Sequence, residues 1–228
     1  MDLTNSEQSK REVQRALASR DELVERLTRA IREDGTAEPL TGLRLRRASA
    51  PTGLGHGVSF PSFCVIAQGS KELLLGDSLY RYTPAQYLIS TAALPIASRV
   101  TEASKEKPYL GIVLKLDPTI VGSVLVEAGH RAPRSQTAVT AIDVSPLVAS
   151  LLDAVVRLVR LLDSPTDARF LAPLLRREIV YGLLWERRVA GSVRLRSWLA
   201  PPTASPRRSS GCGTTSTSRC ASRISRRS

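Results

Sequence analysis

A series of short apolar stretches between Phe63 and Leu116 constrains the fold of this chain more than any other feature. The stretches are rich in β-branched and aromatic residues, and Gly, Pro, Asp or Ser residues separate them. Stretches of this kind are typical of β-strands. Gly76-Asp77 stands between two of them and predicts a tight hairpin, because glycine adopts positive φ at little steric cost. Since no helical pattern interrupts the series, we expect an antiparallel barrel or sandwich.

Helical patterns flank this β region on both sides. Apolar residues recur at spacings of three and four from Ser6 to about Glu33, and Asp34-Gly35 ends that pattern. Leu43 to Ala48 alternates and predicts an early strand. Three later helix starts are predicted where a capping side chain precedes a proline, namely Asp117-Pro118, Ser145-Pro146 and Ser164-Pro165. The chain is therefore expected to have an α+β fold.

The formal net charge of +12 is distributed unevenly along the chain. Eight arginines and no Lys, Asp or Glu lie from Gly191 onward, which leaves about +4 for everything before it. Ser, Thr, Arg and Pro dominate this segment, and we predict a disordered basic tail over 191–228. Such a tail contacts phosphates without reading bases, so we expect DNA binding to be nonspecific if it occurs at all, and we predict no DNA-binding residues.

The residue pattern argues against catalysis and against metal binding. His56 and His130 are the only histidines, whereas a cupin-type metal site needs two or three histidines that converge with a carboxylate. Neither a Gly-x-Ser-x-Gly motif nor a plausible Cys/His pair is present. The glycine-rich segment from Pro51 to Gly57 is expected to be irregular and lacks the pattern of a phosphate-binding loop. We therefore expect no enzymatic activity, no cofactor and no metal.

The expected setting is the cytoplasm. No apolar run is long enough to span a membrane, and the residues after Met1 are polar, unlike a signal peptide. The three cysteines, Cys64, Cys212 and Cys220, do not form a disulfide framework. Cys64 lies in a predicted core strand, where a free thiol behaves as a small apolar side chain. These features favour a reducing compartment.

A set of short motifs occurs in a characteristic order between Leu23 and Arg196. The motifs are Cys64–Lys71 (Cys-Val-Ile-Ala-Gln-Gly-Ser-Lys), Leu75-Gly76, Tyr87–Ser90, Leu94-Pro95, Ala103-Ser104, Lys107–Tyr109 and Leu171–Leu184. Together they resemble the N-terminal domain of AraC-type (AraC/XylS) transcription regulators. The resemblance implies a cupin-like antiparallel β-barrel that senses an effector or mediates dimerisation. It also implies that a pair of helix-turn-helix motifs follows the barrel and its helices.

The chain departs from this pattern near residue 200, where no apolar periodicity marks a helix-turn-helix. Codon degeneracy provides a hypothesis. With permitted codons for Ser209 to Ser225, a shifted frame spells Ile-Glu-Trp-Leu-Arg-Asp-His-Phe-Asp-Gln-Pro-Leu-Arg-Ile-Glu-Asp-Ile, which resembles the opening of the missing domain. We therefore expect a frameshift near Arg196 that truncates the regulator. An in-frame tail with no helix-turn-helix coding downstream would refute this, so the nucleotide sequence from codon 190 onward is decisive.

The predicted organisation has four parts. These are an N-terminal helix (1–36), a cupin-like sensor barrel (37–135), a helical dimerisation or linker region (136–190) and the basic tail (191–228). The expected function is effector sensing and dimerisation in an AraC-family regulator, as a homodimer that does not bind its operator specifically. A stand-alone small-molecule-binding cupin protein stays open as the alternative.

Side chains that point into the barrel are expected to line any effector pocket. Strand alternation nominates six of them: Ile66, Gln68, Tyr80, Tyr82, Tyr87 and Arg99. Ordinary packing or surface exposure is the alternative for each, because alternation alone does not establish which face points inward. A broad apolar face nominates the subunit contact: Val148, Leu151, Leu152, Val155, Val159 and Leu162. Core packing within the chain is the alternative for that face.

Overall fold

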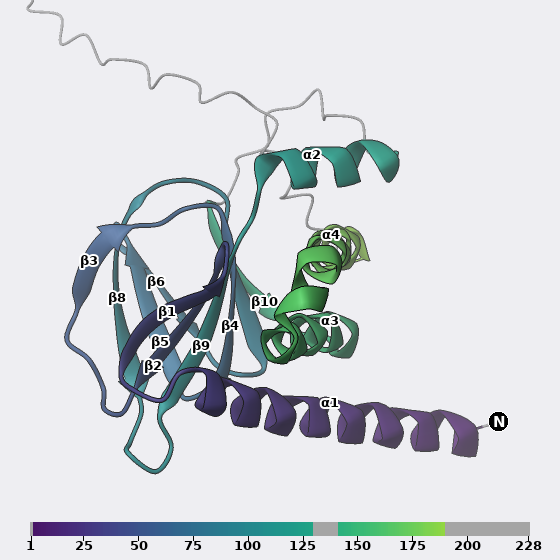
Figure 1. Ribbon diagram of the computed structural model, residues 1–228, viewed down its shortest axis with the longest axis horizontal. Coiled ribbons are helices and arrows are strands. Elements are labelled where there is room, and N and C mark those ends of the chain that lie inside the picture. The colour runs from purple at the N-terminus through teal and green to yellow at the C-terminus, as the bar shows by residue number, and fades with distance from the viewer. Residues whose placement is uncertain (1, 130–140, 190–228) are drawn as a thin grey trace, which may run out of the picture.

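The structure is a computed structural model that describes residues 2–129 and 141–189, without the side chains of residues 2–12 and 186–189. The predictions for the basic tail and for the shifted reading frame lie outside the described residues. So does His130. Within the described part, the element order is helix, nine strands, helix, strand and two further helices (Figure 1).

The strands form two antiparallel sheets. Their bounds are β1 (Gly35–Leu40), β2 (Leu43–Ala48), β3 (Gly55–Val58), β4 (Ser62–Gln68), β5 (Ser70–Leu75), β6 (Ser78–Tyr82), β7 (Gln86–Ser90), β8 (Pro95–Glu102), β9 (Tyr109–Lys115) and β10 (Ile142–Pro146). The larger sheet has six strands in the order β1-β2-β9-β4-β7-β10, and the smaller has four in the order β3-β8-β5-β6. The expected α+β fold with a cupin-like antiparallel barrel is confirmed.

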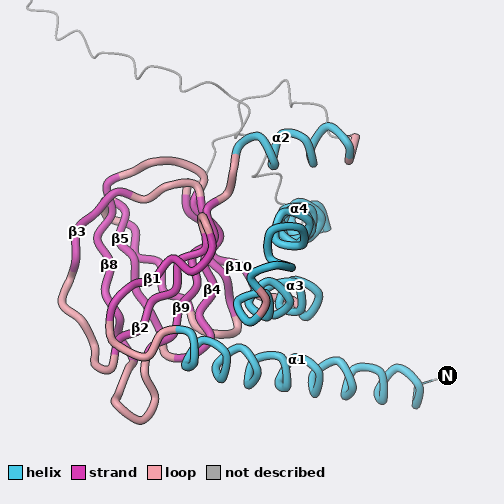
Figure 2. Tube along the Cα trace, viewed as in Figure 1, coloured by secondary structure: helices cyan, strands magenta, loops and turns pink. Residues whose placement is uncertain are grey.

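The helices lie outside the barrel, on the side of the larger sheet, and α2 packs on α4 (Figures 1 and 2). They are α1 (Asp2–Ala30), α2 (Pro118–Glu127), α3 (Ala149–Arg160) and α4 (Pro165–Val189), with a 3₁₀ turn at Leu161–Asp163. In Figure 1, α1 runs along the lower edge of the molecule and extends past the other helices. None of the described helices combines the length and apolarity needed to cross a membrane.

Each face of the larger sheet has its own apolar core. Leu43, Leu45, Phe63, Leu110 and Ile112 lie on the helix-facing side and pack with α1, α3 and α4. The opposite side faces the smaller sheet and encloses the barrel interior, where side chains from both sheets form a second, smaller cluster. This two-sided arrangement follows from the period of two along a strand, which sends alternate side chains to opposite faces.

Two glycines determine how the chain turns. Gly76 has a φ of 56° in the predicted hairpin, where Leu75 pairs with Ser78. Gly69 lies between β4 and β5 with a φ of 85°, and a Cβ there would stand 2.4 Å from the Glu102 carbonyl oxygen. Because β4 belongs to the larger sheet and β5 to the smaller, Gly69 is the point at which the chain passes from one sheet to the other.

The helix predicted to start at Asp117-Pro118 is confirmed, and the one predicted at Ser145-Pro146 is wrong in its start. The Asp117 carboxylate accepts a hydrogen bond of 2.8 Å from the Thr119 N–H. Ser145 and Pro146 instead end β10, which pairs with β7, and α3 begins only at Ala149. A Ser-Pro pair suits a strand end as well as a helix start. The predicted barrel domain ended at residue 135. That boundary leaves β10 out of the barrel, although β10 pairs with β7 of the larger sheet.

Two further strands were not predicted from the pattern. β1 (Gly35–Leu40) pairs with β2, and β3 lies within the segment expected to be an irregular glycine-rich loop. Every β3 residue is exposed, so the strand carries no alternation of buried and exposed positions. β3 is formed by its backbone pairing with β8, a long-range contact that local sequence does not reveal.

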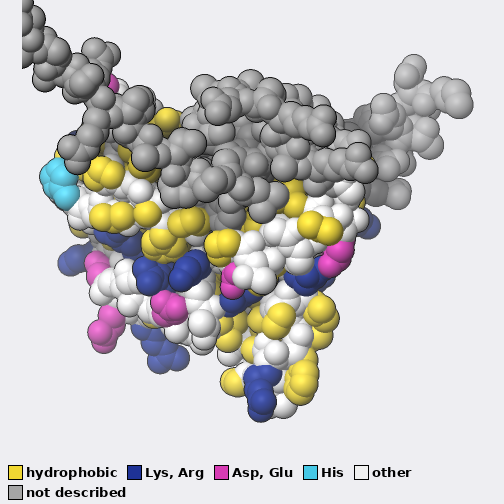
Figure 3. Space-filling view, turned by 90° about the horizontal axis from the view of Figure 1, so that it is seen from above, with side chains coloured by type: hydrophobic (Ala, Val, Ile, Leu, Met, Phe, Trp, Pro, Cys, Tyr) yellow, Lys and Arg dark blue, Asp and Glu magenta, His cyan; other side chains and the backbone are white. Residues whose placement is uncertain are grey.

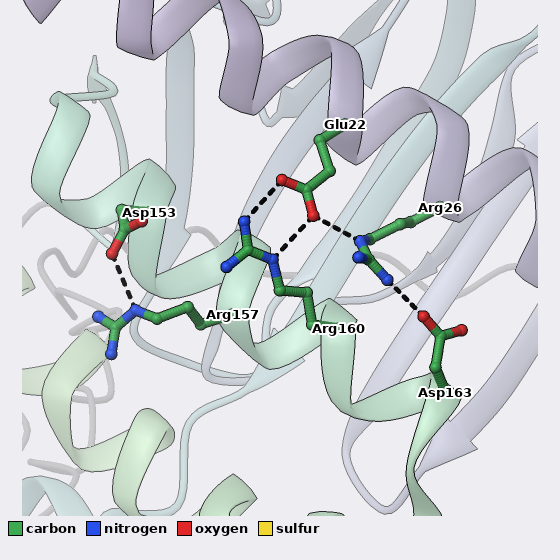
Figure 4. Close-up of polar contacts among 6 residues, drawn as sticks. All are labelled: Glu22, Arg26, Asp153, Arg157, Arg160 and Asp163. Atoms are coloured by element: carbon green, nitrogen blue, oxygen red, sulfur yellow. Dashed lines mark hydrogen bonds and ion pairs between the residues drawn. The ribbon is translucent and has the colours of Figure 1, made fainter.

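Arginine–carboxylate pairs join the helices at the rim of the helix-facing core (Figure 4). Glu22 of α1 accepts hydrogen bonds from Arg26 at 2.7 Å and from Nε and Nη2 of Arg160 at 2.8 and 2.7 Å. Arg26 also pairs with Asp163. These pairs connect α1 to the end of α3 and leave the apolar core between the helices free of charges.

Candidate functional site

The barrel interior is the place where polar and apolar side chains converge in this molecule. Its buried cluster consists of Ala48, Cys64, Ile66, Leu73, Tyr82, Leu88, Val100, Tyr109 and Ile142. Most of these are aliphatic, as in an ordinary core. The two tyrosines and the thiol are exceptions, and two cationic side chains point toward them from the surrounding strands.

Tyr82 and Tyr109 bring two hydroxyl groups into this space. Both residues are buried, and their hydroxyls lie close enough to influence each other's ionisation. Burial raises the pKa of both phenols above the usual range, so both are neutral at physiological pH. The pair is a neutral hydrogen-bonding group inside an apolar barrel, because a phenol both donates and accepts.

Gly111 makes room for the Tyr109 ring. A Cβ at Gly111 would lie 2.4 Å from the Tyr109 hydroxyl oxygen and 2.8 Å from the ring carbon that bears it. Gly111 pairs with Arg46 on one side and with Ile66 on the other, in a row across three strands of the larger sheet. Because Gly111 has no side chain, the Tyr109 hydroxyl can occupy the space between Arg46 and Ile66.

Lys71 reaches the same region from the smaller sheet. In the register of that sheet it stands between Val100 and Tyr82, both of which belong to the interior cluster. Burial lowers the pKa of the Lys71 amine, the nearby charge of Arg46 lowers it further, and the Cys64 thiol opposes this effect. Burial also raises the pKa of Cys64, which keeps that thiol protonated.

The two cations of this region have no acidic partner among the described residues. The ion pairs that the structure describes include neither Arg46 nor Lys71. Arg46 also lines an open hollow at the barrel rim, together with residues 34–36 and 50–52. No group of three or more His, Cys, Asp or Glu side chains that could hold a metal occurs in the described part of the chain.

Three of the six predicted pocket residues lie in or next to the interior. Ile66 and Tyr82 belong to the buried cluster, and Tyr80 packs against it while partly exposed. Gln68 belongs to neither cluster: it pairs in register with Leu110 of the helix-facing core, and its side-chain amide donates a hydrogen bond of 2.8 Å to the Pro108 carbonyl. Tyr87 has the opposite orientation and packs on the helix side, 5.3 Å from the Phe63 ring between centroids. The prediction that Tyr87 points into the barrel is therefore wrong.

Arg99 is also placed on the other side of its strand from the interior. Its guanidinium donates to Glu72 at 2.8 Å, and Arg81 donates to the same carboxylate from the next strand at 2.9 Å. These hydrogen bonds, that of Arg81 first, lower the pKa of Glu72. In the register, Arg99, Glu72 and Arg81 form the outward row next to the inward row of Lys71. The prediction that Arg99 points into the barrel is therefore wrong.

The predicted subunit contact on α3 is used within the chain. Leu151, Leu152, Val155 and Val159 are buried against α1, α4 and the larger sheet. Val148 and Leu162 are partly buried against the same core. This burial agrees with core packing, the alternative given for that face.

A different apolar surface is exposed on α4. Phe170, Leu174, Tyr181 and Trp185 follow a helical spacing along one face and are each about half exposed or more. We call these four residues the α4 stripe. Tyr181 and Trp185 are stacked, with ring centroids 6.2 Å apart. Figure 3 views the molecule from the α2 side, and hydrophobic side chains lie among charged ones where grey atoms do not cover them.

Sequence reasoning missed Arg46, Lys71 and Tyr109, which supply most of the polar groups of the interior. Leu43 and Leu45 face the helices, and alternate residues of a strand point to opposite faces. The sequence would therefore have predicted that Arg46 faces the barrel, if the leucines had first been assigned to the helix side. Lys71 lies next to Glu72, and local sequence gives no reason to send the lysine inward and the glutamate outward. Only the pairing of Lys71 with Tyr82 resolves that ambiguity.

Residues 39–190 match the family described as AraC-type transcriptional regulator N-terminus. No curated protein matches the chain. Among solved structures, an apo form of ToxT from Vibrio cholerae is similar with a TM-score of 0.44 and 9% identity over 68% of this chain and 58% of that chain. ToxT bound to an unsaturated fatty acid gives 0.42 and 10% over 72% and 59%. The AraC-like transcriptional activator CuxR gives 0.38 and 8% over 66% and 53%. The chain thus spans somewhat more than half the length of these proteins.

Proposed function

The chain belongs to the family of AraC-type transcriptional regulators through its N-terminal domain, and we propose that the described residues are the small-molecule-sensing part of such a regulator. This family is a class of transcription regulators and not of enzymes. The observation that carries the proposal is the set of polar groups inside the barrel. Arg46, Lys71, Tyr82 and Tyr109 meet in an otherwise aliphatic interior.

The composition of this interior suits a ligand site better than a purely structural core. Binding sites for small molecules are mostly apolar and contain a few convergent polar groups that orient the ligand. Here Leu73, Leu88 and Val100 supply apolar surface, and the tyrosine hydroxyls supply hydrogen bonds. Partly exposed Arg46 belongs to the inward row of the larger sheet and also lines the hollow formed by residues 34–36 and 50–52, so we propose that a ligand enters from this side.

We further propose that the α4 stripe contacts a second copy of the chain. Exposed aromatic and aliphatic side chains in a row on one helix face are typical of helix-mediated association. β9 carries Tyr109 and Gly111 and leads directly into α2, and Arg177 of α4 bonds to Ser123 and Glu127 of α2. This chain of contacts is the route by which a change in the barrel reaches the α4 stripe.

Reading of DNA is not assigned to the described residues. A recognition helix presents polar and basic side chains to base edges, whereas the exposed face of α4 is aromatic and aliphatic. α3 is buried between the sheet and its neighbouring helices. The described residues therefore support sensing and self-association as their contribution to regulation.

The sensing proposal is tested by filling the barrel. Ile66→Trp adds bulk to the interior, and Val58→Trp places the same side chain on exposed β3 as a matched control. Compounds found to raise the melting temperature of the unchanged chain should lose this effect in Ile66→Trp and keep it in Val58→Trp. Circular dichroism of both variants checks that they are folded. Equal binding by folded Ile66→Trp would place the ligand elsewhere and refute the proposal.

A second experiment distinguishes a regulator from a stand-alone small-molecule-binding protein. It compares sedimentation velocity of the chain with and without a compound that raises its melting temperature. A sensor of the proposed kind changes its self-association when the ligand binds, because β9 and α2 connect the barrel to the α4 stripe. Binding with no change in association would favour the stand-alone protein.

A further inference from the structure

We infer that the first part of α1 packs on the α4 stripe of a second copy of the chain, and that two copies exchange these parts about a two-fold axis. Residues 2–17 of α1 are called the free segment below. The inference rests on the proposed role of the α4 stripe in self-association, and it names the segment of the partner that covers the stripe. The exchange can be wrong while the α4 stripe remains the subunit contact.

The apolar face of α1 continues past the part of the chain that buries it. Residues at alternating spacings of four and three lie on one face of a helix, and here they are Val13, Leu17, Arg20, Val24, Leu27 and Ile31. Leu27 and Ile31 are buried in the helix-facing core, and Val24 packs against it. Val13 and Leu17 are 59% and 53% exposed, and α1 extends past the other helices in Figure 1. The free segment therefore presents Val13 and Leu17 beyond the body of its own chain.

The free segment lies away from the α4 stripe of the same chain. α3 packs on both α1 and α4 and lies between them (Figure 1). The hydrogen bonds from Arg160 to Glu22, drawn in Figure 4, hold α1 on the end of α3. The stripe is on the face of α4 opposite to Ile179 and Leu183, which are buried in the helix-facing core. Only a second copy can therefore supply an α1 segment to the stripe.

The two surfaces match in length and in shape. The free segment and the stretch from Phe170 to Trp185 each span about 22 Å, at a rise of about 1.5 Å per residue. A groove of about 330 Å³ between α2 and α4 adjoins the stripe, and Val124, Ala128 and Tyr181 are among the residues that line it. A helix that lays its apolar face along a groove inserts side chains at helical spacing. Leu17 is a side chain of the size that this groove can take.

The buried area favours the exchange over direct pairing of two α4 stripes. Each stripe side chain is about half exposed or more, so the four together offer on the order of 400 Å². Two stripes packed on each other would bury about 800 Å² in total, which is typical of crystal packing. An exchange makes two contacts, each of one stripe and a similar area of one free segment, and buries about 1,600 Å². That is the size of a standard stable interface.

Two charge substitutions on the full chain test the exchange. Leu17→Glu places a negative charge on the free segment, and Leu174→Lys places a positive charge on the α4 stripe, both at exposed positions. Ala18→Glu adds a charge to another face of α1 and is the matched control. We expect each of the two variants alone to raise the dimer dissociation constant at least about tenfold in sedimentation velocity, and the control to leave it unchanged. Circular dichroism checks that all three are folded.

An equimolar mixture of Leu17→Glu and Leu174→Lys gives the result that is specific to an exchange. In a homodimer of either variant, both contacts bury a charge without a counterion. In a mixed dimer, one contact keeps both original leucines, and the other brings the introduced carboxylate and the introduced amine together. We therefore expect the mixture to associate at least about tenfold more tightly than either variant alone.

The outcomes separate this inference from the proposed function. If Leu17→Glu associates like the unchanged chain and Leu174→Lys does not, the exchange is wrong and the α4 stripe stands as the subunit contact. If both variants are weakened and their mixture does not recover, the two surfaces belong to separate contacts, and the exchange is equally refuted. If both variants associate normally, or the unchanged chain is monomeric, the exchange and the contact through the α4 stripe both fall.

Discussion

The two faces of the larger sheet differ in what their side chains do, although the same strands build both. On β2, Leu43 and Leu45 join the helix-facing core, and Arg46 faces the barrel. On β9, Leu110 and Ile112 face the helices, and Tyr109 lies in the barrel cluster. The helix side carries arginine–carboxylate pairs at its rim, such as Glu22 with Arg26 and Arg160, whereas the barrel side holds two cations without acidic partners in the described residues. One face packs against the helices, and the other carries the polar groups of the proposed ligand site.

The largest effect is expected for a truncation on the helix side. Leu110 is fully buried in the helix-facing core. Leu110→Ala should lower the free energy of unfolding by about 2–5 kcal/mol, because it removes buried methyl groups and leaves a cavity. Urea denaturation measures this. Leu79→Ala, at an exposed position of β6, is the matched control and should change the free energy by less than about 0.5 kcal/mol. Equal losses in the two variants would contradict the assignment of this core.

A smaller loss is expected for added bulk on the barrel side. Gly111→Ala places a methyl group against the Tyr109 hydroxyl and should lower the free energy of unfolding by about 1–3 kcal/mol through overpacking. Combining it with Tyr109→Phe removes the atom nearest to the new methyl group. The double-mutant cycle should therefore show a favourable coupling between the two substitutions. Strict additivity would mean that Tyr109 is not packed over Gly111.

A still smaller and pH-dependent effect is expected at the rim. Hydrogen bonds from Arg160 first, and from Arg26, lower the pKa of Glu22 from 4.5 to about 2. Because the folded value lies below the unfolded one, the stabilisation is complete above about pH 4.5 and is lost as the pH falls toward 2. Glu22→Gln should lower the free energy of unfolding by about 1 kcal/mol at neutral pH, since solvent screens this partly exposed group.

Chemical denaturation of both proteins from pH 7 to about pH 2 measures this. The difference between them should shrink steadily with falling pH. A difference that stays constant with pH would show that the Glu22 charge is not responsible. Asp21→Asn, one residue earlier on an exposed position of α1, is the control.

The smallest effect on stability, and the largest on association, is expected outside both cores. Leu174→Glu changes an exposed residue of the α4 stripe and should leave the free energy of unfolding within about 0.5 kcal/mol. It should nevertheless abolish self-association in sedimentation velocity, because it puts a charge into the proposed contact. Val58→Glu makes the same change on β3 and should associate normally. Normal association of Leu174→Glu would remove the α4 stripe as the subunit contact.

Much of the fold was predictable because its signals are local. The turn at Gly76, the cap at Asp117 and the main strands depend on neighbours in sequence, and all are found. β3 and β10 were missed because backbone pairing with β8 and β7 determines them. The pocket prediction was correct in placing Ile66 and Tyr82 inside and wrong for Tyr87 and Arg99. For Tyr87 and Arg99, the strand was predicted correctly but the wrong face of it was assigned to the barrel interior.

The sequence by itself determined the class of fold, the positions of the main strands and helices, and the family to which the chain belongs. Only the tertiary structure decided that Arg46 and Lys71 face one interior, and that the apolar face of α3 is buried within the chain. The physical reason is that alternation along a strand is the same whichever face is buried. The choice between the faces depends on what packs against them, and those partners lie far away in the sequence.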